Sequence, residues 1–153
     1  MQYTNTITIH KPIDEVVRKF TDEDALKHWQ PGLQKMEHIS GEKGKAGSVY
    51  RLYFQLGKRE VIMTETILTM NLPEKFEATY EAKGVWNKEQ ASFEKVNDDT
   101  TIYHGNSKFK FSGFMKIVGW IFPGAFKKQS LKYLENFKAF VEEGKSVLEE
   151  AKS

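Results

Sequence analysis

One face of a helix is marked near the end of the chain by residues that recur at steps of three and four: Phe126, Ser130, Leu134, Phe137 and Val141. Residues at this spacing share one side of an α-helix. The opposite side carries charged residues, which are Lys128, Lys132, Glu135 and Glu142. The pattern predicts a long final helix that packs a mainly apolar stripe against a partner and exposes its other side to water.

Alternating apolar and polar residues predict strands over most of the remaining chain. Residues 3–9 alternate at the start, and turn-forming residues divide 33–111 into six further strand-like runs. The alternation is clearest at 76–81 and 107–111, and it indicates an antiparallel sheet with one covered face. Around 61–68 both registers carry apolar residues, so the inward pair is left open between Met63 with Glu65 and Ile62 with Thr64.

Two short helices are predicted between the first and second strands. Pro12 opens one of them, and Pro31-Gly32 ends the other. The element order is therefore one strand, two short helices, six strands and a long helix, which is an α+β arrangement. We expect a single domain over 1–143, followed by a polar tail at 144–153 that frays.

Composition and charge exclude several classes of protein. The 153 residues carry 23 Lys and Arg against 21 Asp and Glu, and the interspersed signs form no basic stripe of the kind that binds nucleic acid. The chain has no cysteine and opens without a secretory pattern, so we expect a cytoplasmic protein. The apolar run 114–126 is broken by Gly119, Pro123 and Gly124 and is shorter than the ~20 residues that cross a bilayer.

Three stretches carry a resemblance to a known superfamily: Lys11–Val17 after the opening strand, Asp24–Pro31, and Phe114–Ile117 leading into Leu131–Lys138. In this order they resemble the START-like, helix-grip (SRPBCC) superfamily of pollen-allergen ligand carriers, lipid-transfer domains and polyketide cyclases. The resemblance implies a seven-stranded curved antiparallel sheet wrapped round the long C-terminal helix. It further implies a cavity between them for a hydrophobic or amphipathic small molecule, and it implies no single activity.

Glu89 is the main candidate for chemistry. If Phe93 faces inward, alternation brings Glu89 and Asn87 to the same face, where burial among rings raises a carboxyl pKa. If Trp86 faces inward instead, Glu89 is left in water. Tyr103 is a second candidate for an acid, a base or an orienting group.

The predicted ligand cavity combines aromatic residues with a few polar ones. The aromatic set is equally well explained as a packed core, and it consists of Trp29, Tyr50, Phe54, Tyr80, Phe109, Phe111, Trp120 and Phe126. The polar set consists of Asn87, Glu89, Tyr103, Ser107 and Ser130. Ser130 has two interpretations, because a helical serine either binds a ligand or bonds back to the carbonyl one turn earlier.

The sequence offers no metal or phosphate site. The four histidines, His10, His28, His38 and His104, lack a second histidine at ligand spacing, so we expect them to be exposed or locally hydrogen-bonded. The glycine-rich segment 41–48 lacks the Lys-Ser/Thr pair and the following helix of a phosphate loop. No cofactor is expected.

Three functions are compatible with these patterns. The first is binding or transport of a small hydrophobic ligand in the cavity. The second is a cyclase or dehydratase that acts on an aromatic or polyketide-like substrate, with Glu89 and Tyr103 or Ser107 as acid, base or orienting groups. The third is docking of the apolar segment 114–126 on a membrane or a partner, including transient membrane contact, although a helix packed on the sheet edge or a dimer contact explains that segment equally well.

Overall fold

The computed structural model describes residues 1–150 and contains seven strands and six helices in that range. The strands are β1 (Gln2–Ile9), β2 (Leu33–Ser40), β3 (Val49–Leu56), β4 (Arg59–Asn71), β5 (Lys75–Ala82), β6 (Val85–Asn97) and β7 (Thr100–Phe111). The helices are α1 (Ile13–Thr21), the 3-10 helix η1 (Glu23–Ala25), α2 (Leu26–Trp29), α3 (Phe114–Ile121), α4 (Pro123–Glu143) and α5 (Val147–Glu150).

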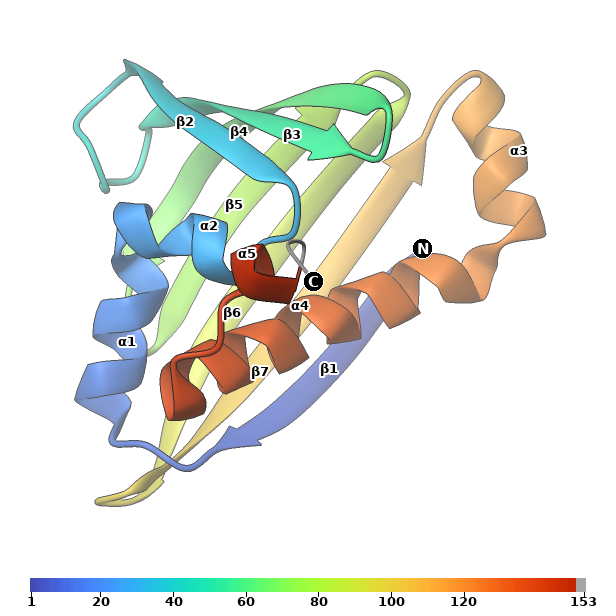
Figure 1. Cartoon of the computed structure of the whole chain (residues 1–153). Helices are drawn as coiled ribbons and strands as arrows, with labels where there is room; N and C mark the ends of the chain where they lie inside the picture. Colours follow the sequence, from blue (N-terminus) through green and yellow to red (C-terminus); the bar gives the residue numbers. More distant parts are fainter. Residues whose placement is uncertain (151–153) are drawn as a thin grey trace.

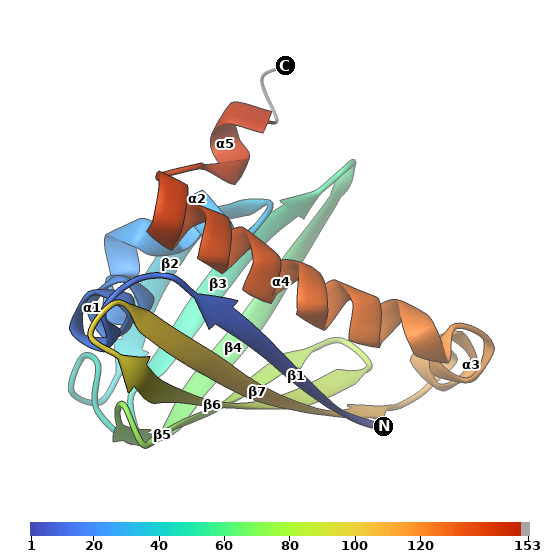
Figure 2. The same cartoon turned by 90° about the horizontal axis from the view of Figure 1, so that it is seen from below.

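All seven strands form one antiparallel sheet in the order β1-β7-β6-β5-β4-β3-β2. Helix α4 lies along one face of this sheet and packs mainly against β1 (Figures 1 and 2). Irregular pairing interrupts the ladder between β2 and β3 and between β4 and β5, and such bulges bend a strand and increase its twist. The predicted α+β fold, with a seven-stranded antiparallel sheet and a long C-terminal helix, is confirmed.

Local sequence accounts for the ends of α4. Pro123 stands in its first turn, where its missing N–H has no intrahelical partner. Gly144 ends the helix in a left-handed conformation with φ 68°, and its N–H bonds back to the Phe140 carbonyl. Pro123 also divides the long apolar run into two helices, because α3 stops at Ile121 and α4 begins two residues later.

The core is densest at the end of the sheet that α1, η1 and α2 cover. Phe20 of α1 is central to it, with ring centroids 5.2 Å from Phe93 and 5.8 Å from Phe137. Trp29 of α2 packs on the same Phe137 ring at 4.9 Å. We call this cluster, with Phe76 and Tyr103, the packed end; its members are buried except Phe20, which is partly buried.

The other end of the sheet, next to α3, is less completely covered. Side chains that face α4 there are only half-buried, namely Val61, Met63, Tyr80, Asn87, Glu89, Phe109, Phe111 and Phe126. Water therefore reaches the inner face of the sheet at this end. We call it the open end.

The first residues after α4 differ from the frayed tail that the sequence predicts. Ser146 is buried, its Oγ lies 2.9 Å from His28 Nδ1 of α2, and α5 packs against α2. The His28 ring also stacks on Phe140, with centroids 5.6 Å apart. A buried serine that caps a short turn is a weak signal in a polar sequence, which explains the miss. Residues 151–153 of the predicted tail lie outside the described residues.

Candidate functional site

Strand register places a row of large side chains across the inner face of the sheet. Tyr50 of β3 pairs with Glu65, Glu65 with Tyr80, Tyr80 with Asn87, and Asn87 with Phe109 of β7. Because paired residues point to the same face of a sheet, these five side chains form one continuous row. The open register of β4 is thereby decided, since Glu65 is the buried one.

A second row, next to the first, carries Glu89. Ala78 of β5 pairs with Glu89 of β6, and Glu89 pairs with Ser107 of β7. Phe93 is buried on the same side of β6, so alternation brings Glu89 and Asn87 to the inner face. Trp86 points outward, where the Lys110 ammonium lies 5.0 Å from the centroid of its ring.

Glu89 holds its carboxylate between two hydrogen-bond donors. Ser107 Oγ donates to Oε2 at 2.6 Å, and Asn87 Nδ2 donates to Oε1 at 2.9 Å. Burial raises the pKa of Glu89 to about 7, although these two bonds favour the charged form and oppose the shift. The carboxyl group therefore changes protonation near neutral pH, which suits it to accept or give a proton.

A second inner carboxyl group, that of Glu65, lies beside the Tyr80 hydroxyl. Only 7% of Glu65 is exposed, and burial raises its pKa, while the Tyr80 hydroxyl opposes the shift. Burial likewise raises the pKa of Tyr80 well above 10, and the charge of Glu65 adds to the increase. In both cases burial disfavours the charged form relative to the same group in water.

Two further tyrosines surround Glu89. Tyr103 is buried against Phe93, with ring centroids 4.9 Å apart, and burial first and the Glu89 charge second raise its pKa. Burial and the same charge raise the pKa of Tyr133 on α4. The Glu89 carboxyl group thus has hydroxyl-bearing side chains of both the sheet and the helix within electrostatic range.

Aromatic rings form the apolar wall of the open end. Phe109 and Phe111 of β7 stack with centroids 6.0 Å apart, and Phe126 of α4 lies 4.8 Å from Phe111. These rings are half-buried, so part of their surface remains available for contact. The predicted lining residues Phe109, Phe111 and Phe126 are brought together here with Asn87, Glu89 and Ser107.

Other predicted lining residues lie elsewhere. Trp29 and Phe54 are buried in the core, and Tyr50 is buried with its hydroxyl accepting a bond from the Gly44 N–H at 2.8 Å. Ser130 is buried and donates to the Phe126 carbonyl at 3.0 Å, which is the back-bonding interpretation. Trp120 does not line the interior as predicted, because Gly119 packs on Phe111 and turns the neighbouring indole into solvent.

Sequence reasoning missed Glu65 and Tyr133. Glu65 was hidden because both registers of β4 carry apolar residues. Tyr133 lies three residues after Ser130, so it is a helical neighbour of the apolar stripe that contains Ser130. An aromatic beside a serine on the buried side of the helix was the available signal.

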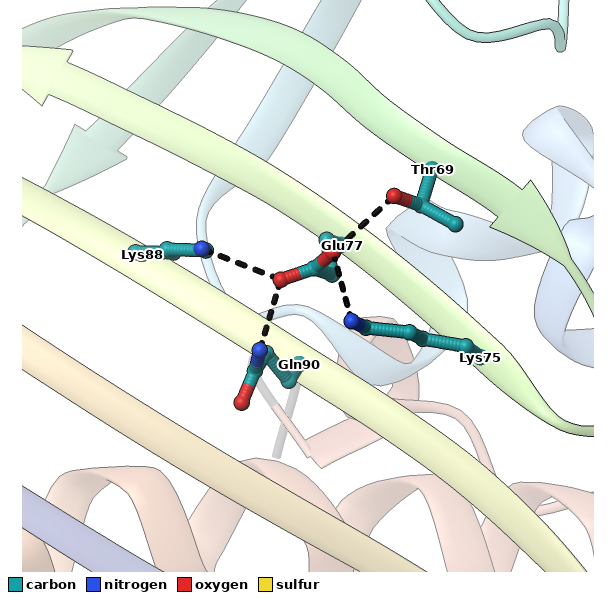
Figure 3. A network of polar contacts seen from close by, with 5 residues as sticks. All are labelled: Thr69, Lys75, Glu77, Lys88 and Gln90. Carbon is teal, nitrogen blue, oxygen red and sulfur yellow. Dashed lines mark hydrogen bonds and ion pairs between the residues drawn. The ribbon is translucent and has the colours of Figure 1, made fainter.

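A separate polar network lies on the outer face of the sheet (Figure 3). Glu77 of β5 accepts bonds from Gln90 at 2.6 Å and Thr69 at 2.9 Å, and it pairs with Lys88 at 3.0 Å and Lys75 at 3.1 Å. The Gln90 and Lys88 contacts, in that order, lower the pKa of Glu77 to about 2. Each carboxylate oxygen has partners, so the network ties β4, β5 and β6 together.

Within residues 1–150, no group of three or more His, Asp or Glu side chains is placed to hold a metal ion. His28 has Ser146 as a partner, and His104 Nε2 lies 2.8 Å from Glu94 Oε2, as expected for locally bonded histidines. None of the helices described is long and apolar enough to cross a membrane.

No protein-family model matches the chain, and no curated protein matches it by sequence. Solved structures do match. The Zhui aromatase/cyclase from Streptomyces sp. R1128 has a TM-score of 0.73 at 13% identity, covering 93% of each chain. A START superfamily protein from Mycobacterium smegmatis has a TM-score of 0.72 at 12% identity, covering 92% of this chain and 97% of that one.

The protein Ara h 8.0201 gives a TM-score of 0.68 at 13% identity, covering 92% of this chain and 97% of the other. Each of the three likenesses extends over more than nine-tenths of both chains. At such low identity the likeness concerns architecture. The chain has the helix-grip fold that the sequence predicts.

Proposed function

We propose that this protein binds a small amphipathic molecule between the open end of the sheet and α4. The ligand's apolar part contacts Phe109, Phe111 and Phe126, and its polar group meets Glu89 and Ser107. One observation supports this most strongly: a carboxyl group with a pKa of about 7 stands beside aromatic rings that are only half-covered by the protein. Neighbours of this fold include a START superfamily protein and an aromatase/cyclase.

The apolar wall supplies most of the binding free energy in this proposal. Covering roughly 200 Å² of ring surface contributes about 5 kcal/mol, at ~25 cal/mol per Å². The polar groups then orient the ligand, because a buried donor or acceptor left unpaired costs free energy. Burial raises the pKa of Glu65 and of Tyr80, so this surface disfavours added negative charge, and a carbonyl or hydroxyl group suits it better than a carboxylate.

The first test asks what the protein carries. Native mass spectrometry of the protein purified from its own host, followed by solvent extraction, should show a bound apolar or amphipathic molecule. Titration with the uncharged apolar dye Nile red should then show weaker binding for Phe126→Ala and an unchanged affinity for Phe114→Ala, because Phe114 is exposed on α3. If only Phe114→Ala weakens dye binding, the dye site lies on α3 and the proposal fails.

A second candidate function is catalysis on a carbonyl compound of the aromatic or polyketide-like class. The hydrogen bond of 2.6 Å between Ser107 and Glu89, together with the Glu89 pKa, favours it, because a general acid or base works best with a pKa near the ambient pH. Glu89 would move the proton, and Tyr103 would orient the carbonyl oxygen. Glu89→Gln should abolish turnover and retain ligand binding. Equal turnover in this variant would remove the catalytic candidate and leave binding.

A further inference from the structure

Helix α3 exposes an apolar surface that nothing within residues 1–150 covers. The exposed fractions are 74% for Phe114, 53% for Ile117, 84% for Trp120 and 52% for Ile121. Their spacing of mainly three and four residues gathers them on one side of the helix. We call these four side chains the α3 face. Scattered exposed apolar residues are ordinary, whereas a contiguous set that includes Trp and Phe marks an interaction surface.

The opposite side of α3 is held on the protein. A Cβ atom at Gly119 would lie 2.8 Å from a ring carbon of Phe111, so the glycine permits a close approach that other residues would obstruct. A Cβ at Gly84 in the β5–β6 turn would lie 2.9 Å from Met115 Cγ, which shows a similar approach. With this side fixed, the α3 face points away from the sheet, and α3 projects at one end of the molecule (Figures 1 and 2).

The chain segment that contains α3 carries lysines and no acidic residue. No Asp or Glu occurs between Asp99 and Glu135, and the same stretch carries six lysines, Lys108, Lys110, Lys116, Lys127, Lys128 and Lys132. The rest of the chain carries 17 Lys and Arg against 21 Asp and Glu, because the whole has 23 and 21. None of the six lysines forms an ion pair with a described residue. The segment 100–134, which includes the α3 face, is thus net positive, and the remainder of the chain is net negative.

We propose that the α3 face docks on the surface of an anionic lipid bilayer. Trp and Phe side chains favour the boundary between headgroups and acyl chains, and adjacent lysines are attracted to anionic headgroups. Lys116 lies on α3 itself, and Lys127 and Lys128 lie in the first turns of α4. The combination of an apolar face with unpaired lysines fits an anionic bilayer better than it fits a second copy of this chain, whose own α3 region would repel it.

Docking would place the open end of the sheet beside the lipid. Phe111, which contacts α3 through Gly119, also contacts Phe126 of the proposed ligand site. An apolar ligand could then exchange between bilayer and protein without crossing water. This consequence rests on the proposed function, whereas the docking itself does not.

The test is sedimentation of the full chain with vesicles of phosphatidylcholine alone and of phosphatidylcholine with a minority of phosphatidylserine. We expect binding to the phosphatidylserine vesicles, a loss of that binding as salt rises, and little binding to phosphatidylcholine alone. Trp120→Ser and the double variant Lys127→Gln/Lys128→Gln should each weaken binding about tenfold. All three positions are exposed, and circular dichroism should show an unchanged fold.

Matched controls change the same chemistry elsewhere. Val96→Ser removes an exposed apolar side chain near the β6–β7 turn, and Lys43→Gln/Lys45→Gln removes two charges from the β2–β3 loop, away from α3 (Figure 1). Both should bind as the unmodified protein does. Equal binding to the two vesicle types, equal loss in controls and α3 variants, or no binding at all would overturn the proposal. A dimer in light scattering that Trp120→Ser dissociates would also overturn it, by assigning the α3 face to a second copy.

The two proposals fail separately. Phe126→Ala should weaken dye binding and leave vesicle binding intact, whereas Trp120→Ser should do the reverse. A loss of vesicle binding in Phe126→Ala with a retained fold would contradict the assignment of membrane docking to the α3 face. Vesicle binding without any ligand in the protein would contradict the proposed function and leave the docking proposal unaffected.

Discussion

Glu89 and Glu77 lie on neighbouring strands and on opposite faces of the sheet, and their surroundings move their pKa values in opposite directions. Glu89 lies among rings, so losing water costs its charged form free energy. Glu77 is also largely covered, but by Lys and Gln side chains that stabilise its charge. One residue type therefore contributes opposite pH dependences to the stability of the same sheet.

For Glu89, the folded pKa of about 7 exceeds the ordinary value of 4.5. Below pH 4.5 both states hold the proton and there is no penalty; between pH 4.5 and 7 the unfolded state ionises first, so stability falls as pH rises. Glu89→Gln should remove this penalty and stabilise the protein by about 3 kcal/mol at pH 8, with little change at pH 4. Urea unfolding at both pH values measures this change in stability. Glu81→Gln, on the exposed face of β5, is the control. An equal effect at both pH values would contradict the assignment.

For Glu77, the folded pKa of about 2 lies below the ordinary 4.5, so its contribution is present above pH 4.5 and is lost as pH falls towards 2. Glu77→Gln should lower stability at pH 7 by about 1–2 kcal/mol, less than the full shift implies because the paired lysines are partly in water. The loss should disappear near pH 2. Thermal unfolding against pH, compared again with Glu81→Gln, checks this. A loss that persists at pH 2 would indicate packing rather than charge.

Alternation predicted that Asn87 and Glu89 share the inner face only if Phe93 points inward, and the burial of Phe93 in the structure decides that alternative over an inward Trp86. Alternation was not enough for Glu65, because the pattern of 61–68 fits both registers and only pairing with Tyr80 of β5 decides between them. Tyr133 depends on the tilt of α4 over the sheet, which no local pattern contains. For a site assembled from four strands and a helix, the sequence therefore predicts only those residues whose strand alternates clearly between apolar and polar positions.

Among the elements, α3 departs most from what its sequence suggests. The order of one strand, two short helices, six strands and a long helix followed from turn residues and periodicity. The apolar run 114–126 was compatible with a membrane or partner contact, an edge helix or a dimer contact, because an apolar pattern does not say which side is covered. Gly119 determines which side of α3 is covered, because its missing side chain lets the Phe111 ring approach that side.

Gly119→Val should loosen α3 from the sheet. The added side chain meets the Phe111 ring, and overpacking of this kind costs about 1–3 kcal/mol. Amide hydrogen exchange over Phe114–Ile121 should accelerate about tenfold while exchange in β6 stays unchanged. Gly124→Ala is the control, since a Cβ there has nothing within 4 Å. Unchanged exchange in Gly119→Val would show that α3 is held by other contacts.

Across the whole molecule, the packed end and the open end differ in how many ring contacts they contain. Phe20 contacts five other rings of the packed end, whereas Phe126 contacts two half-buried rings of the open end. Stability should therefore depend on the first end and ligand contact on the second. Rings at both ends look alike in the sequence, and only the coverage by α1 and α2 distinguishes them.

Phe20→Ala should lower the free energy of unfolding by about 3 kcal/mol, because a ring that fills the packed end leaves a cavity. Phe126→Ala should lower it by about 1 kcal/mol, since that ring is already partly in water. Chemical denaturation of both variants measures the difference. A larger loss of unfolding free energy for Phe126→Ala than for Phe20→Ala would mean that the open end contributes more to stability than the packed end does.

The pairing of β1 with β7 also bears on how the chain is made. Gln2 pairs with Lys108, and Ile9 pairs with Thr101, so β1 is synthesised well before β7, the strand with which it pairs. At typical synthesis rates this delay is roughly 5–20 s, during which an alternating strand has no neighbour. Such long-range closure slows folding and exposes nascent chains to aggregation. Ribosome-bound fragments that end before Thr100 should accordingly need a chaperone, and release of the C-terminal segment should let the sheet close.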